Sequence, residues 1–139
     1  MVGNANNNKL NTLNCLVVDD NAFASIDICN KLQALGIENV TTACNGLDGL
    51  EKIDKMASPP GVILLDLRMP IMGGAEMLSR LSDRKYPGSV IIVSGVDKDT
   101  LSAVEKLAHD CNIKLAGSMS KPPNQQALSE LLLQCVDQP

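Results

Sequence analysis

The stretch Val62-Ile63-Leu64-Leu65-Asp66 contains four apolar residues that are followed at once by a carboxylate. A second stretch, Leu16-Val17-Val18-Asp19-Asp20, has the same arrangement with an acidic pair at its end. Short apolar runs rich in Val, Ile and Leu are typical of strands that are buried on both faces. In an open α/β sheet, ligands bind at the carboxyl ends of the strands. We therefore predict that the three carboxylates meet at a ligand-binding edge.

Two later strands are predicted to end at the same edge with polar side chains. The run Val90-Ile91-Ile92-Val93 ends in Ser94, and the run from Leu115 to Ser120 ends in Lys121-Pro122. The four strand ends together supply three carboxylates, one hydroxyl and one ammonium. Such a set of side chains can hold a divalent cation and a phosphoryl group together.

Helical and strand periodicities alternate along the chain. After Asp20, apolar residues recur at helical spacing up to Leu35, and Gly36 supplies the stop. Further patterns predict strands at 40–43 and 114–118, and helices that begin near residues 47, 75, 100 and 124. Five strands that alternate with five helices indicate an α/β fold with a doubly wound parallel sheet, because parallel strands need crossover helices. The stripe in the last helix is predicted to pack in the core: Leu128, Leu131, Leu132 and Cys135.

The composition limits the class of protein. A chain of 139 residues suits one domain, and its core must be aliphatic because Phe23 and Tyr86 are its only aromatic residues. The net charge of -4, without a run of Lys or Arg, argues against direct nucleic-acid binding. Residues 1–12 are Asn-rich and are expected to form a disordered tail before a domain at 13–136. No segment has the length of about 20 apolar residues that a membrane span needs, and no signal peptide is recognisable, so we expect no membrane contact and a cytoplasmic protein.

The five cysteines are scattered, with no CxxC pair and no histidine nearby. This pattern favours buried free thiols in a reducing compartment over disulfides or zinc. His109 has no acidic or cysteine cluster around it in the sequence, and we expect it at the surface or in a capping role rather than in catalysis.

The motifs and their order resemble the receiver domain of two-component response regulators. The resemblance covers about residues 13 to 136. It implies a flavodoxin-like five-stranded parallel sheet in the order 2-1-3-4-5 with five helices. The matching segments are Val17-Val18-Asp19-Asp20-Asn21, Ala43 to Leu50, Leu65-Asp66-Leu67-Arg68-Met69-Pro70 with Gly73-Gly74, Val93-Ser94-Gly95, and Ser120-Lys121-Pro122.

Phosphoryl transfer assigns a role to each conspicuous residue. Asp66 is the expected nucleophile and forms an acyl phosphate. Asp19 and Asp20, with one oxygen of Asp66, offer the hard ligands that Mg²⁺ prefers, and Mn²⁺ is an alternative cation. The resemblance further implies that the backbone carbonyl of Arg68 binds the metal and that Ser94 and Lys121 contact the phosphoryl group. It also implies a cis Lys121-Pro122 peptide bond.

Simpler interpretations remain open for each residue. Asp19 and Asp20 can be helix caps, Ser94 can be a capping hydroxyl, and Lys121 can be an ordinary surface lysine. One alternative function is an Mg²⁺-dependent aspartyl-phosphate phosphatase or phosphotransferase of the haloacid dehalogenase type. That class needs a second acid two residues after the nucleophile, where this chain has Arg68. A degenerate receiver that acts only as a binding module is expected to have lost acidic or lysine positions, and here all are present.

As a receiver, the chain is expected to be a signalling domain rather than an enzyme. The resemblance implies a histidine kinase or histidine phosphotransfer protein as phosphodonor, and an output domain, fused or separate, as the target. One position departs from the family, since Ser118 stands where receivers commonly carry Phe or Tyr. We expect the conformational switch to run instead through residues 95–109, which follow Ser94. The stretch before Lys121 is similar to receivers fused to cyclic-di-GMP phosphodiesterase domains.

Overall fold

The computed structural model describes residues 9–136 and shows a five-stranded parallel sheet with the strand order β2-β1-β3-β4-β5. The flavodoxin-like doubly wound α/β fold is thereby confirmed. The elements are β1 (Asn14–Val18), α2 (Ala22–Ala34), β2 (Asn39–Ala43), α3 (Gly46–Lys55), β3 (Val62–Leu65), α4 (Gly74–Asp83), β4 (Ser89–Val93), α5 (Lys98–Asp110), β5 (Lys114–Met119) and α6 (Gln125–Val136).

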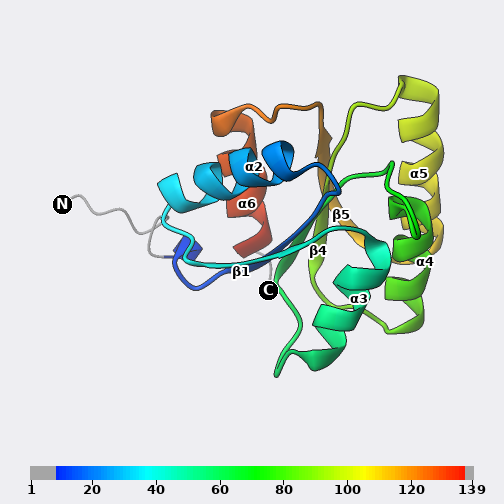
Figure 1. Ribbon diagram of the computed structural model, residues 1–139, viewed down its shortest axis with the longest axis horizontal. Coiled ribbons are helices and arrows are strands. Elements are labelled where there is room, and N and C mark those ends of the chain that lie inside the picture. Colours follow the sequence, from blue (N-terminus) through cyan, green and yellow to red (C-terminus); the bar gives the residue numbers. More distant parts are fainter. Residues whose placement is uncertain (1–8, 137–139) are drawn as a thin grey trace.

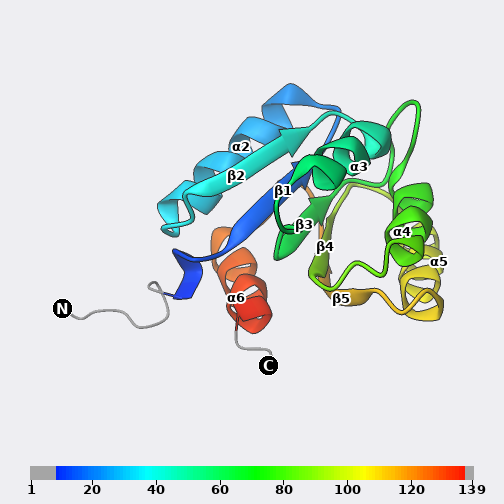
Figure 2. The same cartoon turned by 90° about the horizontal axis from the view of Figure 1, so that it is seen from below.

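Helices cover both faces of the sheet. Helices α2 and α6 lie together on one face, and α3, α4 and α5 lie on the other (Figures 1 and 2). Strands β1, β3 and β4 occupy the middle of the sheet and are almost entirely buried, as their continuous apolar runs predict. Strands β2 and β5 form the edges and are partly exposed. The central strands therefore fix the positions from which the polar residues at their carboxyl ends project.

The core is aliphatic, as the composition predicts. Leu, Ile, Val and Met side chains fill both layers, one on each side of the sheet. Tyr86 is the only aromatic residue in this core, and its hydroxyl donates a hydrogen bond to the carbonyl of Pro60 at 2.7 Å. The Phe23 side chain is 85% exposed and contributes nothing to the core. The predicted stripe of α6 packs inward, with Leu128 and Leu132 buried.

The folded part of the chain begins before residue 13. Residues 9–12 form a helical turn, in which Leu13 N donates to the carbonyl of Leu10 at 3.0 Å. The Leu10 side chain is buried in the layer of α2 and α6. The expectation of a disordered tail over 1–12 is therefore wrong for residues 9–12, because Leu10 buries apolar area that stabilises the turn. Residues 1–8 lie outside the described part.

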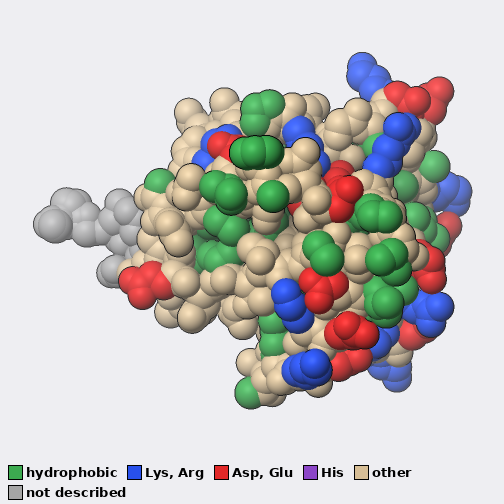
Figure 3. Space-filling view, in the orientation of Figure 1, with side chains coloured by type: hydrophobic (Ala, Val, Ile, Leu, Met, Phe, Trp, Pro, Cys, Tyr) green, Lys and Arg blue, Asp and Glu red, His purple; other side chains and the backbone are tan. Residues whose placement is uncertain are grey.

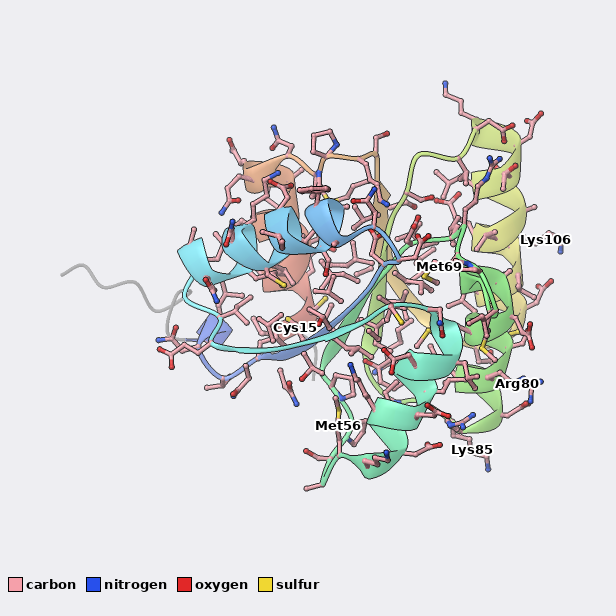
Figure 4. All side chains as sticks on the ribbon, in the orientation of Figure 1. Cys15, Met56, Met69, Arg80, Lys85 and Lys106 are labelled. Carbon is pink, nitrogen blue, oxygen red and sulfur yellow. The ribbon has the colours of Figure 1, made fainter. Side chains whose placement is uncertain are left out.

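All five cysteines are free thiols, as expected, but only Cys15 on β1 is buried (Figure 4). Burial raises the pKa of the Cys15 thiol to about 12, with Cys135 and Cys29 nearby adding to the shift. Cys44 is exposed, so the expectation of burial fails there. His109 is exposed, as predicted. Within residues 9–136, no helix is long and apolar enough to cross a membrane.

Candidate functional site

Asp19 and Asp66 lie side by side because their strands are neighbours. Strands β1 and β3 pair in parallel with Val18 opposite Leu65, and each strand is followed directly by its aspartate. The amide of Asp66 donates to the carbonyl of Val18 at 2.9 Å, which ties the two strand ends together. One carboxylate oxygen from each of Asp19, Asp20 and Asp66 lies within 4.8 Å of the others. Asp19 and Asp66 are buried, whereas Asp20 is exposed.

In each buried aspartate, one carboxylate oxygen accepts a backbone hydrogen bond and the other oxygen faces the site. Asp19 Oδ1 accepts from the amide of Asn21 at 2.9 Å, and Asp66 Oδ1 accepts from the amide of Leu67 at 2.8 Å. The cap of α2 is Asn21, whose Oδ1 accepts from the amide of Ala24. The interpretation of Asp19 and Asp20 as helix caps is therefore wrong. The Oδ2 atoms of Asp19 and Asp66 face the centre of the site.

Lys121 supplies the positive charge that these oxygens meet. Its Nζ lies 2.7 Å from Asp19 Oδ2 and 3.2 Å from Asp66 Oδ2, and its side chain is 26% exposed. Partial burial alone would lower the pKa of Lys121, but the two carboxylates outweigh burial and raise it above its ordinary value. The Lys121-Pro122 peptide is cis, as the resemblance implies. Lys121 therefore belongs to the same site as Asp19 and Asp66 and is not an ordinary surface lysine.

Ser94 contributes a buried hydroxyl that lacks a hydrogen-bond partner. It follows β4, which lies beside β3, and its amide donates to the carbonyl of Met119 at 3.1 Å. Its Oγ is buried and makes no hydrogen bond within the described part of the structure. A buried polar group without a partner costs about 1–3 kcal/mol. The cap of α5 is Asp97, so the capping interpretation of Ser94 is wrong.

Two glycines allow the loop after Asp66 to pack closely over the site. A Cβ at Gly74 would lie 2.6 Å from the carbonyl oxygen of Asp66, and a Cβ at Gly46 would lie 2.8 Å from Cγ of Met72. The amide of Gly46 donates to the carbonyl of Met72 at 2.9 Å. A side chain at Gly74 or Gly46 would therefore push the loop away from Asp66.

The carboxylate cluster fits a small, hard cation. Mg²⁺ binds oxygen at about 2.0–2.1 Å, so ligand oxygens on opposite sides of the ion are about 4.2 Å apart. The oxygens of Asp19, Asp20 and Asp66 lie within 4.8 Å of one another and need only small shifts to reach that geometry. Exposed Asp20 leaves one side of the cluster open to solvent and to an approaching ligand.

The site lies beside a hollow that is lined by both apolar and polar side chains. A groove of about 490 Å³ runs from Asp19 and Asp20 between α2 and β2. Hydrophobic side chains gather over α2 and β2, and hydrophobic and charged side chains are mixed over α3, α4 and α5 (Figure 3). The sequence patterns did not single out this apolar surface, because an exposed hydrophobic residue in a helix has the same pattern as a buried one.

Comparison with known proteins identifies the family. Residues 15–132 match the family described as the response regulator receiver domain. The chain belongs to this family. An uncharacterized response regulatory protein of Vibrio cholerae is 36% identical over 103 residues, which are 73% of this chain and 42% of that protein. The chemotaxis protein CheY of Treponema pallidum is 35% identical over 86 residues, 62% of this chain and 60% of that protein.

Solved receiver structures share the fold. A response regulator from Colwellia psychrerythraea is 27% identical, covers 91% of this chain and 98% of its own, and has a TM-score of 0.74. The response regulator domain of Thermotoga maritima CheB is 26% identical, with the same coverage and a TM-score of 0.74. The chain spans 42% and 32% of the lengths of the first two curated relatives it matches. The receiver domain is a phosphoacceptor module of two-component signalling, so the family overrules the haloacid dehalogenase alternative.

Proposed function

We propose that this receiver accepts a phosphoryl group on Asp66 Oδ2 from the phosphohistidine of a kinase or phosphotransfer protein. One observation carries the proposal: the only Asp66 oxygen without a backbone hydrogen bond faces an ammonium, beside a second buried carboxylate. In the transfer, Oδ2 forms a bond to phosphorus while the phosphorus–nitrogen bond to histidine breaks. The imidazole leaves with the electron pair of that bond.

A divalent cation would be held by Asp19, Asp20, Asp66 and the backbone carbonyl of Arg68. When bound, Mg²⁺ or Mn²⁺ neutralises charge that develops on the phosphoryl oxygens. The fit of the three carboxylates supports this assignment, and the carbonyl is taken from the family resemblance. Asn21 and Leu67 hold the other carboxylate oxygens through their amides, so Asp19 and Asp66 need little reorganisation.

The hydroxyl and the ammonium would bind the transferred group. Ser94 Oγ has no partner in the structure, and a phosphoryl oxygen would give it an acceptor. Lys121 is already within 3.2 Å of Asp66 Oδ2 and would meet a second phosphoryl oxygen as a compact positive charge. Both residues would act mainly on the negative charge of the transferred group, which is where preorganised donors accelerate phosphoryl transfer.

Exposed hydrophobic side chains around the site support a protein as the donor. Four large hydrophobic residues are exposed in the described part of the chain. Phe23 and Ile26 lie in the first turns of α2, Leu47 lies in the first turn of α3, and Ile71 lies in the loop after Asp66. All four therefore lie at the edge of the sheet that carries the carboxylates. We call these residues the apolar rim, and we propose that the phosphodonor protein docks on it and excludes water from Asp66.

Ile71 adds a second argument for docking at the apolar rim. Its φ is 72°, a left-handed conformation that a β-branched residue rarely adopts, and its side chain is 76% exposed. Both features are unfavourable in the isolated domain. Strained residues cluster at functional sites, where a partner can compensate for the strain.

Phosphorylation by a small donor tests the proposal. Acetyl phosphate with Mg²⁺ should add a single base-labile phosphoryl group, detected by intact-mass measurement, and Asp66→Asn should abolish it. The double variant Asp19→Ala, Asp20→Ala should lose Mg²⁺ binding in calorimetric titration, whereas Glu130→Ala, on the exposed side of α6, should retain both properties. Equal phosphorylation of Asp66→Asn, or unchanged Mg²⁺ binding in the double variant, would overturn the assignment.

The remaining expectations extend beyond the domain. We propose that the chain is not itself an enzyme and acts in the cytoplasm, where it passes the signal to an output domain, fused or separate. A protein-glutamate methylesterase of Halalkalibacterium halodurans supports a fused output, since it is 41% identical to this chain over only 31% of its own length. Separate pull-down experiments with the phosphorylated and unphosphorylated domain would identify the target.

A further inference from the structure

One hydrogen bond joins α5, the helix that follows Ser94, to β5, the strand that precedes Lys121. Ser118 Oγ in β5 donates to Glu105 Oε2 in α5 at 2.6 Å. A bond between a hydroxyl and a carboxylate at this distance is charge-assisted and about twice as strong as a neutral one. We propose that this bond, the Ser118–Glu105 latch, holds α5 in its resting position and so limits how readily the site takes a phosphoryl group. The proposal rests on the function proposed for Asp66.

The latch is placed to couple Ser94 to Lys121. Residues 95–97 connect Ser94 to the start of α5, and Glu105 lies in the middle of that helix. On the other side, Ser118 lies in the last part of β5, shortly before Lys121. Among residues 9–136, no other side-chain hydrogen bond connects α5 with β5. A change in the position of Ser94 is therefore transmitted through α5 to this bond.

The apolar packing between α5 and β5 is limited, so a single polar bond can determine the position of the helix. The β5 residues range from half-buried to exposed, and α5 buries only Val104 and Ala108. Glu105 and Ser118 are themselves half-buried, so water competes with the bond less than at the surface. An aromatic side chain at position 118 would add apolar contact here. Serine instead offers a hydrogen bond that can break and re-form.

The direction of the effect follows from the unpaired hydroxyl of Ser94. A phosphoryl oxygen on Asp66 would give Ser94 Oγ an acceptor. In the proposed switch, Ser94 moves toward this oxygen together with the loop and the start of α5. The latch opposes that movement because it holds α5 against β5. A ligand shifts a two-state equilibrium only by its difference in affinity for the two states. In a variant without the latch, this bond no longer has to be broken when the phosphoryl group binds. Beryllofluoride, which mimics the phosphoryl group, should therefore bind such a variant more tightly.

Beryllofluoride binding in Mg²⁺ tests the latch. Ser118→Ala and Glu105→Ala should each raise the affinity for beryllofluoride by about threefold to tenfold. This is the effect expected when one hydrogen bond no longer favours the resting position of α5 over the position that binds the phosphoryl group. The double variant should show the same increase as either single variant, because both remove one bond. The control is Asp110→Ala, which removes another α5 carboxylate whose partner, Lys106, points away from the domain (Figure 4). This control should leave the affinity unchanged.

Hydrogen exchange provides a readout that separates the latch from general loosening. Without beryllofluoride, the two latch variants should exchange faster at amides of α5 and β5 only, while Glu105→Gln, which can still accept from Ser118, should fall between wild type and Glu105→Ala. Unchanged or weaker beryllofluoride binding in both latch variants, or additive effects in the double variant, would overturn the latch alone. If the wild-type protein binds no beryllofluoride, the function proposed for Asp66 fails and the latch fails with it.

Discussion

Replacing Lys121 by methionine should destabilise the domain strongly without Mg²⁺ and only weakly with it. The ammonium lies 2.7 Å from Asp19 Oδ2 and 3.2 Å from Asp66 Oδ2, and both carboxylates are buried. Removing one partner from a buried ion pair costs about 3–5 kcal/mol. The Lys121 side chain is 26% exposed, so we expect about 2 kcal/mol after allowance for solvent screening. Bound Mg²⁺ supplies positive charge to the same oxygens, and the loss should then fall below about 1 kcal/mol.

Urea unfolding with a chelator and with saturating Mg²⁺ measures this difference. With a urea dependence of about 2 kcal/mol per molar, the midpoint of Lys121→Met should fall by about 1 M in chelator. The control is Lys106→Met, which removes an ammonium that is 77% exposed and paired with Asp110 at 3.2 Å. Its effect should stay below about 0.5 kcal/mol in both buffers. Equal destabilisation of Lys121→Met with and without Mg²⁺ would refute the idea that the ammonium and the cation serve the same carboxylates.

Three further outcomes follow from the structure. Phe23→Ser should slow transfer from a phosphohistidine protein about tenfold and leave phosphorylation by acetyl phosphate unchanged, because only the protein contacts the apolar rim; equal slowing with both donors would contradict docking there. Ile71→Gly should raise the unfolding free energy by up to about 1 kcal/mol in urea, whereas Ile71→Ala should not, because only glycine relieves the left-handed backbone. The raised pKa of Cys15, about 12 against 9.0, means that its contribution to stability is present below pH 9 and is lost as the pH rises toward 12, where the folded thiol ionises. Cys15→Ala should flatten that loss in unfolding measured at several pH values, and Cys44 should be alkylated in the native protein long before Cys15.

The sequence predicted most of the fold because its central strands are unambiguous. The four apolar residues before Asp66 form β3 with the predicted bounds, since a strand buried on both faces needs no polar alternation. Helix α5 begins at Lys98 rather than at Thr100, because Asp97 caps it through the amide of Thr100. The polar residues of the site converge because parallel strands end at one edge, which the order of the elements already implies.

Other features depend on tertiary contacts that no local pattern records. Leu10 stands alone in an Asn-rich segment, and only its packing in the core layer that contains residues of α2 and α6 makes it a core residue. Glu105 and Ser118 are separated by thirteen positions, and only the packing of α5 on β5 brings them together. Ile71 looks like an ordinary apolar loop residue in the sequence. Its left-handed backbone becomes visible only in the structure.

The two ends of the parallel strands differ in what they contribute: the carboxyl ends carry the functional site, and the opposite ends carry stabilising contacts. The carboxyl edge carries buried charges, an unpaired hydroxyl and the apolar rim, all of which are unfavourable in the isolated domain. At the opposite ends of the strands, the Tyr86 hydroxyl donates a hydrogen bond to the Pro60 carbonyl. There too, two nitrogens of Arg84 donate to the carboxylate of Asp54 at 3.0 and 2.9 Å. Opening of the domain should therefore begin at the carboxyl edge, where Mg²⁺, a phosphoryl group and a partner protein each remove one of the unfavourable terms. Ligands that act on the least stable edge of a fold can change its conformation without unfolding the rest, and the receiver places its phosphoacceptor at that edge.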